Sequence, residues 1–561
     1  MSPLFFMDLL GLIPEIFLLL GTSYLLGYAV WIHKSYLKPQ SAWYGQEYRF
    51  LSSFITHNIW MGMLICLGTL SLVYDHAFDS MYVCYDTLVL DPLSLFLKCL
   101  ILASTLGIFM LSFAYSEESR LNNFEFVLLI LLSALSMMFL VSSYDFISLY
   151  LAIEFQSLSF YVLAAMKKDS GFSIEAGLKY FILGAFSSGL YLFGASLIYG
   201  TFGTTQFEHI GLLSTGMAQQ DPSLVFDGPV FIGLSFLTVA FLFKITAAPF
   251  HMWGPDVYEG APMIVTAFFS TAPKVALVGV IFRMFHVGFF HYVYIWAPIF
   301  LLSSLVSMFY GSFGAMGQTR LKRLLAYSSI GHIGYILIGF IAGTLEGLQS
   351  VLIYLTVYVV MTLCMFASIL ASQSPIHKEP FNKVIELKDL EHLGQRHPIL
   401  ALTLSITLLS MAGIPPLAGF VSKYYLFLSA LDSSLYSLAI VGILTSVVSC
   451  YYYIRVIKTM YFQAVKDSSY VGYDDVLSVT QSRGGSSESE SDEAFDVQNK
   501  DDLHALLVVA HQEGRLDSNT AHEDFKRAFV IGLTCLFILF LFFYPAHLFI
   551  LAHKGALALS L

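Results

Sequence analysis

The chain has 561 residues, of which 57% are hydrophobic and only 12% are charged, and its mean hydropathy is +0.73. These proportions exclude a water-soluble domain of this length and predict an all-α polytopic membrane protein. The formal net charge is −11, and the six cysteines form no Cys-x-x-Cys pair or Cys/His cluster, so we expect no zinc, c-type haem or iron–sulfur site.

Runs of about 20 apolar residues, the length that crosses a bilayer as a helix, predict about fourteen transmembrane helices. They cover residues 8–30, 57–74, 88–113, 123–142, 145–166, 176–200, 229–250, 261–286, 292–312, 325–344, 347–371, 399–428, 433–457 and 528–552. An even number of spans places both termini on one side. No Arg-rich leader or cleavage site precedes the first span, so we expect synthesis in the organelle or bacterium where the protein works.

Basic residues are concentrated in alternate connections between these spans. The basic connections carry Lys34, Lys38 and Arg49; Arg120; Lys167 and Lys168; Arg320, Lys322 and Arg323; and Lys378, Lys383, Lys388 and Arg396. The other connections carry almost none, and Arg283 is the exception. The positive-inside rule then places the basic connections in the matrix or cytoplasm, and both termini on the opposite face.

Two predicted spans are interrupted in corresponding ways. Pro249 breaks residues 229–250 five residues after Lys244, while residues 399–428 contain Gly413-Ile-Pro-Pro and Gly419 ahead of Lys423. Interrupted helices in matching positions are typical of inverted-repeat transporters. We therefore predict two inverted five-helix repeats, each with a broken helix. The expected divisions are an N-terminal three-helix segment, the two repeats, an acidic and Ser-rich insertion loop, and a C-terminal helix, at residues 1–122, 123–286, 292–457, 458–527 and 528–561.

Ionisable residues within the spans indicate a path for charge, because a charged group in hydrocarbon costs several kcal/mol unless it is paired or meets water. These residues are Glu154, Lys179, Lys244, Lys274 and Lys423. A lysine without water loses its proton readily and a nearby carboxylate restores it, whereas arginine stays charged. We expect Glu154 to lie within ion-pair reach of Lys244 or Lys179.

Together with His332, these residues are expected to face the interior at mid-membrane depth, bridged by water and small polar side chains. Each also has a simpler reading. Lys179 can anchor an interface, Lys423 can lie at the surface, and His332 can be a hydrogen-bonded core residue. Lys98 reads as a snorkelling lysine, and Glu15 as a helix-start acid near the surface.

Five sequence strings resemble a known family. They are LYLAIEFQS at 149–157, EAGLKYF at 175–181, FKITAAPFHMWGPDVYEGAP at 243–262, QTRLKRLLAYSSIGH at 318–332 and AGIPPLAGF at 412–420. They resemble subunit 2 of NADH:ubiquinone oxidoreductase (respiratory complex I), in its plant-type mitochondrial version. The resemblance is strong over about 120–460. The stretch 466–525 resembles nothing in that family, and we expect it to be ordered against neighbouring subunits.

The resemblance implies a proton-translocating, antiporter-like membrane-arm subunit, coupled to electron transfer from NADH to ubiquinone in its partners. It implies that Glu154 pairs with Lys244, that Lys179 modulates this pair, and that Lys274, His332 and Lys423 continue the path toward an exit. It also implies that FMN and the iron–sulfur clusters lie in partner subunits. The expected partners are other membrane-arm subunits and lipids, including cardiolipin, with no nucleic acid.

The expected location is the mitochondrial inner membrane, as a multi-pass protein with its termini in the intermembrane space, or alternatively a bacterial plasma membrane. The alternative function is a subunit of a secondary cation/proton antiporter complex. A third reading is a scaffolding subunit with a vestigial channel. Flavin and iron–sulfur absorbance in the intact assembly separates the first function from the second.

Overall fold

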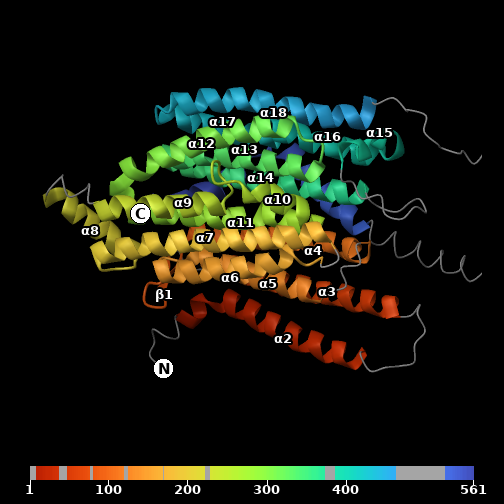
Figure 1. Ribbon diagram of the computed structural model, residues 1–561, viewed down its shortest axis with the longest axis horizontal. Coiled ribbons are helices and arrows are strands. Elements are labelled where there is room, and N and C mark those ends of the chain that lie inside the picture. Colours follow the sequence, from red (N-terminus) through yellow and green to blue (C-terminus); the bar gives the residue numbers. More distant parts are fainter. Residues whose placement is uncertain are drawn as a thin grey trace, which may run out of the picture.

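The computed structural model describes residues 8–36, 47–75, 80–118, 124–167, 170–220, 228–372, 386–462 and 525–560. Within them the chain forms a bundle of long, roughly parallel helices (Figure 1). Eleven helices within these residues are long and apolar enough to cross a membrane. The expected insertion at 466–525 lies almost wholly outside the described residues.

The first half of the bundle contains long helices and one short antiparallel hairpin. Its helices are α2 (Ile13–Tyr36), α3 (Glu47–Tyr74), α4 (Pro92–Glu118), α5 (Glu125–Ser142), α6 (Phe146–Ala164), α7 (Gly171–Phe202), α8 (Phe207–Gln220), α9 (Gly228–Lys244), α10 (Trp253–Gly260) and α11 (Met263–Arg283). The hairpin pairs β1 (Met81–Val83) with β2 (Leu88–Leu90). The span expected at 88–113 therefore begins only at Pro92, because residues 88–90 belong to this hairpin.

The second half follows two short helical turns, η2 (Met284–Gly288) and η3 (Phe290–Tyr292). Its helices are α12 (Val293–Met316), α13 (Leu321–Ala342), α14 (Leu345–Ser372), η4 (Leu387–Leu390), α15 (Leu393–Arg396), α16 (Pro398–Ala412), α17 (Ala418–Asp432), α18 (Tyr436–Phe462) and α21 (Ala546–Ser560). Residues 525–540 are also helical.

The eleven long helices match eleven of the predicted spans. Of the other three, the spans at 399–428 and 528–552 are each divided into two helices, whereas the span at 229–250 contains α9 alone, because α10 begins only at Trp253. Both predicted breaks are confirmed, between α9 and α10 and between α16 and α17. The third break was not predicted: the C-terminal span at 528–552 is interrupted between residue 540 and α21. Pro545 stands just before α21, where it lacks the N–H that a continuous helix needs.

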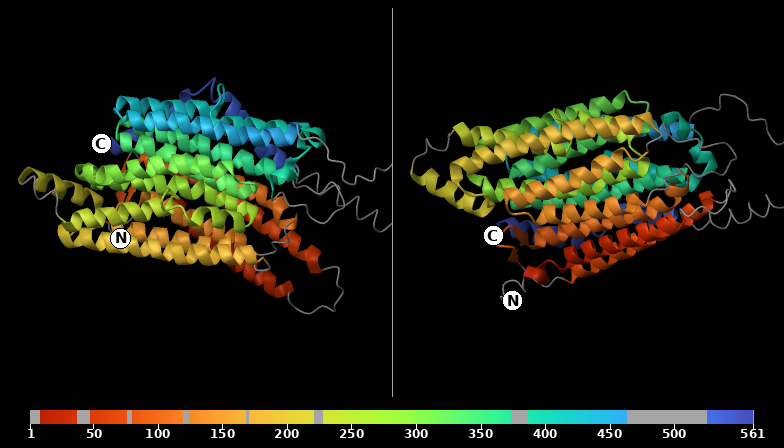
Figure 2. Two further views of the ribbon diagram at one scale, coloured as in Figure 1. Left: turned by 45° about the horizontal axis from the view of Figure 1, so that its top comes forward. Right: turned by 60° about the horizontal axis from the view of Figure 1, so that its bottom comes forward.

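The two ends of the bundle differ in charge. The hairpin and α8 lie at one end, with the start of α2 and the end of α21 (Figures 1 and 2). There a Cβ on Gly11 would meet Leu90, and one on Gly555 would meet Leu93. The opposite end, where α15 lies in Figure 1, carries the described basic connections, and Glu259 of α10 pairs with Arg320 and Arg323 of one of them. We call these the hairpin end and the basic end.

Candidate functional site

The core of the bundle holds ionisable side chains at both helix breaks. Lys244 is the last residue of α9, and Lys423 lies in the second turn of α17. The C-terminal end of a helix leaves backbone carbonyls without partners inside the helix, and it carries partial negative charge. A break inside the membrane therefore supplies acceptors for a cation.

At the second break these carbonyls hold the lysine directly. Lys423 Nζ donates to the carbonyl oxygens of Met411 and Ala412, each at 2.9 Å, and the side chain is buried. Gly413 follows with a φ of +89°, and a Cβ there would lie 2.9 Å from the Lys423 side chain. Glycine is thus required both for the left-handed backbone and for the close approach of the lysine.

Gly419 lets the two half-helices meet. A Cβ at this position would lie 1.8 Å from the backbone oxygen of Ser410, which side-chain movement cannot relieve. The Gly419 N–H also donates to Ser410 Oγ. The expected simpler reading of Lys423 as a surface residue is not what the structure shows, because its side chain is enclosed at the break.

At the first break the lysine is left without such acceptors. Lys244 Nζ is buried and has no hydrogen-bonding partner among the described residues. Two carbonyl oxygens near this break already accept other hydrogen bonds: Trp253 Nε1 donates to the carbonyl oxygen of Phe243, and Ser303 Oγ donates to that of Ala248. The two breaks are therefore alike in backbone form and different in how they hold their cations.

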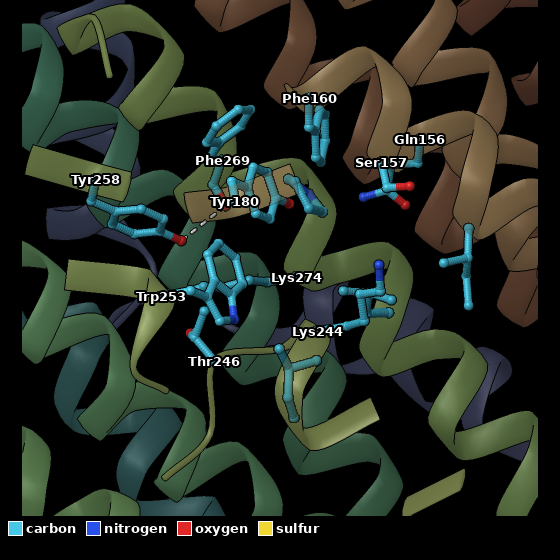
Figure 3. A pocket seen from close by; sticks show the side chains of 14 residues that line it. Gln156, Ser157, Phe160, Tyr180, Lys244, Thr246, Trp253, Tyr258, Phe269 and Lys274 are labelled. Carbon is cyan, nitrogen blue, oxygen red and sulfur yellow. Dashed lines mark hydrogen bonds between the residues drawn. The ribbon is translucent and has the colours of Figure 1, made fainter. Parts of the chain in front are cut away.

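A cavity of about 30 Å³ lies between Lys244 and Lys274, lined also by Gln156, Ser157 and Thr246 (Figure 3). A buried water needs roughly 10–15 Å³ of such volume, so about two waters fit between the two lysines. Thr246 Oγ1 is buried without a partner in the described part of the chain and gives such a water one contact.

The expected ion pair of Glu154 with Lys244 or Lys179 is not formed. Glu154 is only half buried, its Oε1 has no partner among the described residues, and its Oε2 accepts a 3.3 Å hydrogen bond from Ser157 Oγ. The physical reason is position: Glu154 lies at the edge of the outward face of α6, beside exposed Leu151 and Leu158.

Lys179 does not face the interior. Its side chain is 42% exposed at the basic end, and its Nζ pairs with Glu175 at 2.8 Å and with Asp256 at 2.9 Å. Asp256 and Glu259 of α10 continue the charge network to Arg323, and Glu259 also binds Arg320. The helix begins at Gly171, earlier than expected, and Lys179 is held there by Glu175 of the same helix and Asp256 of α10 instead of by Glu154.

Tyrosines connect Lys274 with His332. Lys274 Nζ donates to Tyr358 Oη at 3.0 Å, and the rings of Tyr358 and His332 lie 5.3 Å apart. His332 Nδ1 lies 2.6 Å from Tyr354 Oη, and its Nε2 lies 3.4 Å from Tyr453 Oη.

Tyr335 completes the connection to Lys423. Its ring lies 6.2 Å from that of His332, and Lys423 Nζ lies 5.1 Å from the Tyr335 ring centroid. A cavity of about 10 Å³, close to the volume of one water, borders both His332 and Lys423. Phenol groups from α14, α13 and α18 therefore join Lys274, His332 and Lys423. Small polar side chains of the expected kind, Ser312, Ser328 and Ser449, line the cavity beside His332 and Lys423.

Sequence reasoning missed these tyrosines and the α10 carboxylates. Tyr354 and Tyr358 are four residues apart on one face of α14, a spacing that was visible in the sequence. Asp256 and Glu259 lie inside the 243–262 string that carries the family resemblance. Among the described residues, no group of three or more His, Cys, Asp or Glu side chains could hold a metal ion.

Two readings of the N-terminal segment are wrong. Lys98 does not snorkel and Glu15 does not lie near the surface: their side chains are 2% and 1% exposed, and Lys98 Nζ lies 2.6 Å from Glu15 Oε1. A second buried pair, Arg283 with Asp91 at 2.6 Å, explains the one basic residue that broke the loop pattern. Each buried charge is compensated by a partner that is distant in the sequence: Glu15 comes from α2, and Asp91 stands just before α4.

This fold and this site define a polytopic helical membrane protein with a lysine at each of two helix breaks and a buried row of ionisable residues. The model of the family described as NADH:quinone oxidoreductase/Mrp antiporter, TM, matches residues 143–449. NADH-ubiquinone oxidoreductase chain 2 of Marchantia polymorpha is 43% identical over 556 residues, 99% of each chain. The Arabidopsis thaliana protein of the same name is 46% identical, over 81% of this chain and 87% of its own.

The chain belongs to the NADH:quinone oxidoreductase/Mrp antiporter family of membrane subunits, within its chain 2 group. Subunit N 1 of the NADH-quinone oxidoreductase of Rhizobium meliloti is 46% identical, over 66% of this chain and 75% of its own. The same fold occurs in respiratory complex I of Thermus thermophilus (TM-score 0.68, 24% identity, 96% of this chain and 98% of that one). It also occurs in the Mrp complex of a Dietzia species (TM-score 0.71, 19% identity, 98% and 96%).

Proposed function

We propose that this chain is a proton-translocating, antiporter-like membrane-arm subunit of an NADH:ubiquinone oxidoreductase. Electron transfer takes place in partner subunits that hold FMN, the iron–sulfur clusters and the sites for NADH and ubiquinone. This chain moves protons in response. Membership of the chain 2 group supports the assignment, and the connected row from Lys274 through His332 to Lys423 is the observation that carries it.

Each group in this row supplies a different part of the proton path. Lys244 and Lys274 exchange a proton through the water in the cavity that both line. Tyr358 accepts the hydrogen bond of Lys274 and stands against the ring of His332, so it passes the proton onward. His332 then delivers it to Lys423, whose two backbone acceptors stabilise the ammonium form.

Glu154 acts as the charge that sets the state of Lys244. Its partnerless Oε1 and the partnerless Nζ of Lys244 leave both free to approach when a neighbouring subunit or a helix movement displaces α6. Lys179 acts as a modulator in this proposal: it is held by Glu175 and Asp256 here, and a swing toward Glu154 would neutralise that carboxylate.

The proposal includes a location and a division of the chain. The chain lies in the mitochondrial inner membrane, with its basic end in the matrix and its termini in the intermembrane space. Residues 123–286 and 292–457 form the two repeats, and 458–527 form an insertion on the matrix side. The partners are other membrane-arm subunits and lipids, with cardiolipin suited to the basic end.

The decisive experiment replaces Lys244 by Met in the intact complex. Proton pumping and coupled NADH oxidation should fall while the complex assembles with all its flavin and iron–sulfur absorbance. Lys458→Met, on an exposed position of α18, is the matched control and should pump normally. A normal proton-to-electron ratio in the Lys244 variant would refute the proposal. An assembly with normal cation/proton exchange but no flavin or iron–sulfur absorbance would instead support the antiporter alternative.

A further inference from the structure

The side of the bundle between α6 and α7 is hollowed into an open groove of about 740 Å³. Its mouth is at the hairpin end, where Thr204, Gln206 and His209 follow α7. From there it runs along both helices as far as Tyr150 and Tyr191. None of the lysines and no other member of the row described above borders this groove.

Buried polar groups without partners line the groove. Asp145 is only 5% exposed, and its Oδ1 has no hydrogen-bonding partner among the described residues. Thr204 Oγ1 is buried and partnerless in the same way. Because a buried carboxylate oxygen is costly without a hydrogen bond, the groove floor beside Asp145 is a place for water.

A small cavity continues from the closed end of the groove to Lys244. It has a volume of about 10 Å³, close to that of one water, and it is lined by Tyr150, Tyr191, Ser187, Ser188 and Lys244. Tyr150 and Tyr191 line both hollows, so they form the partition between them. Lys244 lines the inner side of this partition with the apolar part of its side chain, and its Nζ has no hydrogen-bonding partner among the described residues.

The partition consists of two stacked rings of unequal freedom. The rings of Tyr150 and Tyr191 lie 6.1 Å apart with an interplanar angle of 11°. Tyr191 is 3% exposed and its Oη donates to the carbonyl of Phe146 at 3.1 Å, which fixes it. Tyr150 is half buried and borders the groove, so a change of its side-chain rotamer opens the partition without moving the backbone.

We propose that the groove is the aqueous entrance of a second route to Lys244, from the hairpin end, with Tyr150 as its gate against Tyr191. The inference rests on the proposed proton translocation and adds a route to it. When Tyr150 turns, water from the groove enters the small cavity, and a proton leaving the Lys244 ammonium passes along this water to the groove. Glu154 lies one turn beyond Tyr150 on the same face of α6, beside this route.

Lys244 then borders two hollows, one toward Lys274 and one toward the hairpin end. The closed gate prevents a continuous water path between the groove and the lysine row. Lys244 is therefore a branch point of the proton path: a proton on Lys244 passes either along the row toward Lys274 or out through the groove.

The test is thiol accessibility in the assembled complex, in membranes of known orientation. Thr205→Cys in the groove and Ser187→Cys behind the gate are treated with a membrane-impermeant, cationic methanethiosulfonate from the hairpin side. The chain without added cysteines supplies the background. We expect fast modification of Thr205→Cys and slow modification of Ser187→Cys. Adding Tyr150→Ala should accelerate the latter at least tenfold, and Tyr150→Leu should accelerate it less.

Ser133→Cys, on the fully buried face of α5 and outside both hollows, is the matched control and should stay unmodified in every background. Failure to modify Thr205→Cys would show that lipid or a neighbouring subunit fills the groove and would overturn the proposal. An unchanged Ser187→Cys rate in both Tyr150 variants would also overturn it. Labelling reports access rather than pumping, so a normal proton-to-electron ratio in Lys244→Met would refute the proposed function while leaving the route intact.

Discussion

The buried pair of Glu15 and Lys98 fastens α2 to α4, and its removal should loosen the N-terminal segment. Both side chains are at most 2% exposed, and Lys98 Nζ and Glu15 Oε1 are 2.6 Å apart. With an effective dielectric constant of about 20, Coulomb's law gives roughly 6 kcal/mol of attraction at this distance. Desolvation of the two charges offsets much of that attraction, so the intact pair contributes little net stability.

Breaking the pair has a much larger effect than its net contribution. Lys98→Met leaves Glu15 buried without a cation, and its Oε2 already has no partner among the described residues. Leaving one buried charge unpaired costs about 3–5 kcal/mol, whereas replacing both partners by apolar residues is often neutral. We therefore expect Lys98→Met and Glu15→Leu to destabilise the segment, and the double variant to recover most of the loss.

The reactivity of Cys66 provides the assay. Cys66 is fully buried on α3, with its Sγ 3.8 Å from Thr105 Oγ1 of α4, and α2 packs on the same helix where Gly21 meets Ile65. A membrane-permeable maleimide reaches Cys66 only when the segment opens. At 1.36 kcal/mol per factor of ten, a loss of about 3–5 kcal/mol raises the labelling rate by roughly two to three and a half powers of ten.

The double variant Glu15→Leu/Lys98→Met supplies the control, and its labelling rate should lie within about tenfold of that of the native chain. The reasoning fails if the single variants label Cys66 as slowly as the native chain. It also fails if the double variant labels as fast as the single variants, because the loss would then come from packing rather than from an unpaired charge.

Three further predictions follow from groups at the two ends of the bundle. An impermeant amine reagent should modify Lys167 only from the matrix side. An impermeant thiol reagent should modify Thr205→Cys, in the 202–227 connection, only from the opposite side. Modification of both residues from one side would refute the topology. Asp256→Asn should lower the free energy of unfolding by at most about 1 kcal/mol, and by less at high salt. The effect is small because the Lys179 and Asp256 side chains are 42% and 37% exposed, so water and salt screen their attraction. A large, salt-independent loss of stability would contradict this. Burial, with a smaller effect of Asp8, raises the pKa of the Cys84 thiol in the hairpin turn, so less thiolate is present at a given pH. Alkylation of Cys84 should therefore reach half its maximal rate at a higher pH than alkylation of a free cysteine peptide. An equal or lower midpoint would contradict the role of burial.

The sequence alone determined the parts of this fold that depend on the bilayer. Apolar runs long enough to cross hydrocarbon predicted fourteen spans because an unpaired backbone cannot exist in lipid, and the basic residues divided the connections between the two ends. Pro249 and the Gly413-Ile-Pro-Pro string predicted two breaks, because these residues cannot continue a helix. The lysines were conspicuous because a charge in an apolar run is costly.

Only the tertiary structure decided which partner each charge meets. Lys274 and Tyr358 are 84 residues apart in the chain, and Lys98 and Glu15 are 83 apart, so no local pattern linked them. In a soluble helix, polar residues mark the outer face, but lipid is as apolar as the core. The apolar pattern therefore did not separate α11, which is buried all round, from α7, which is largely exposed, or reveal that Glu154 and Lys179 lie at edges while Lys423 lies within.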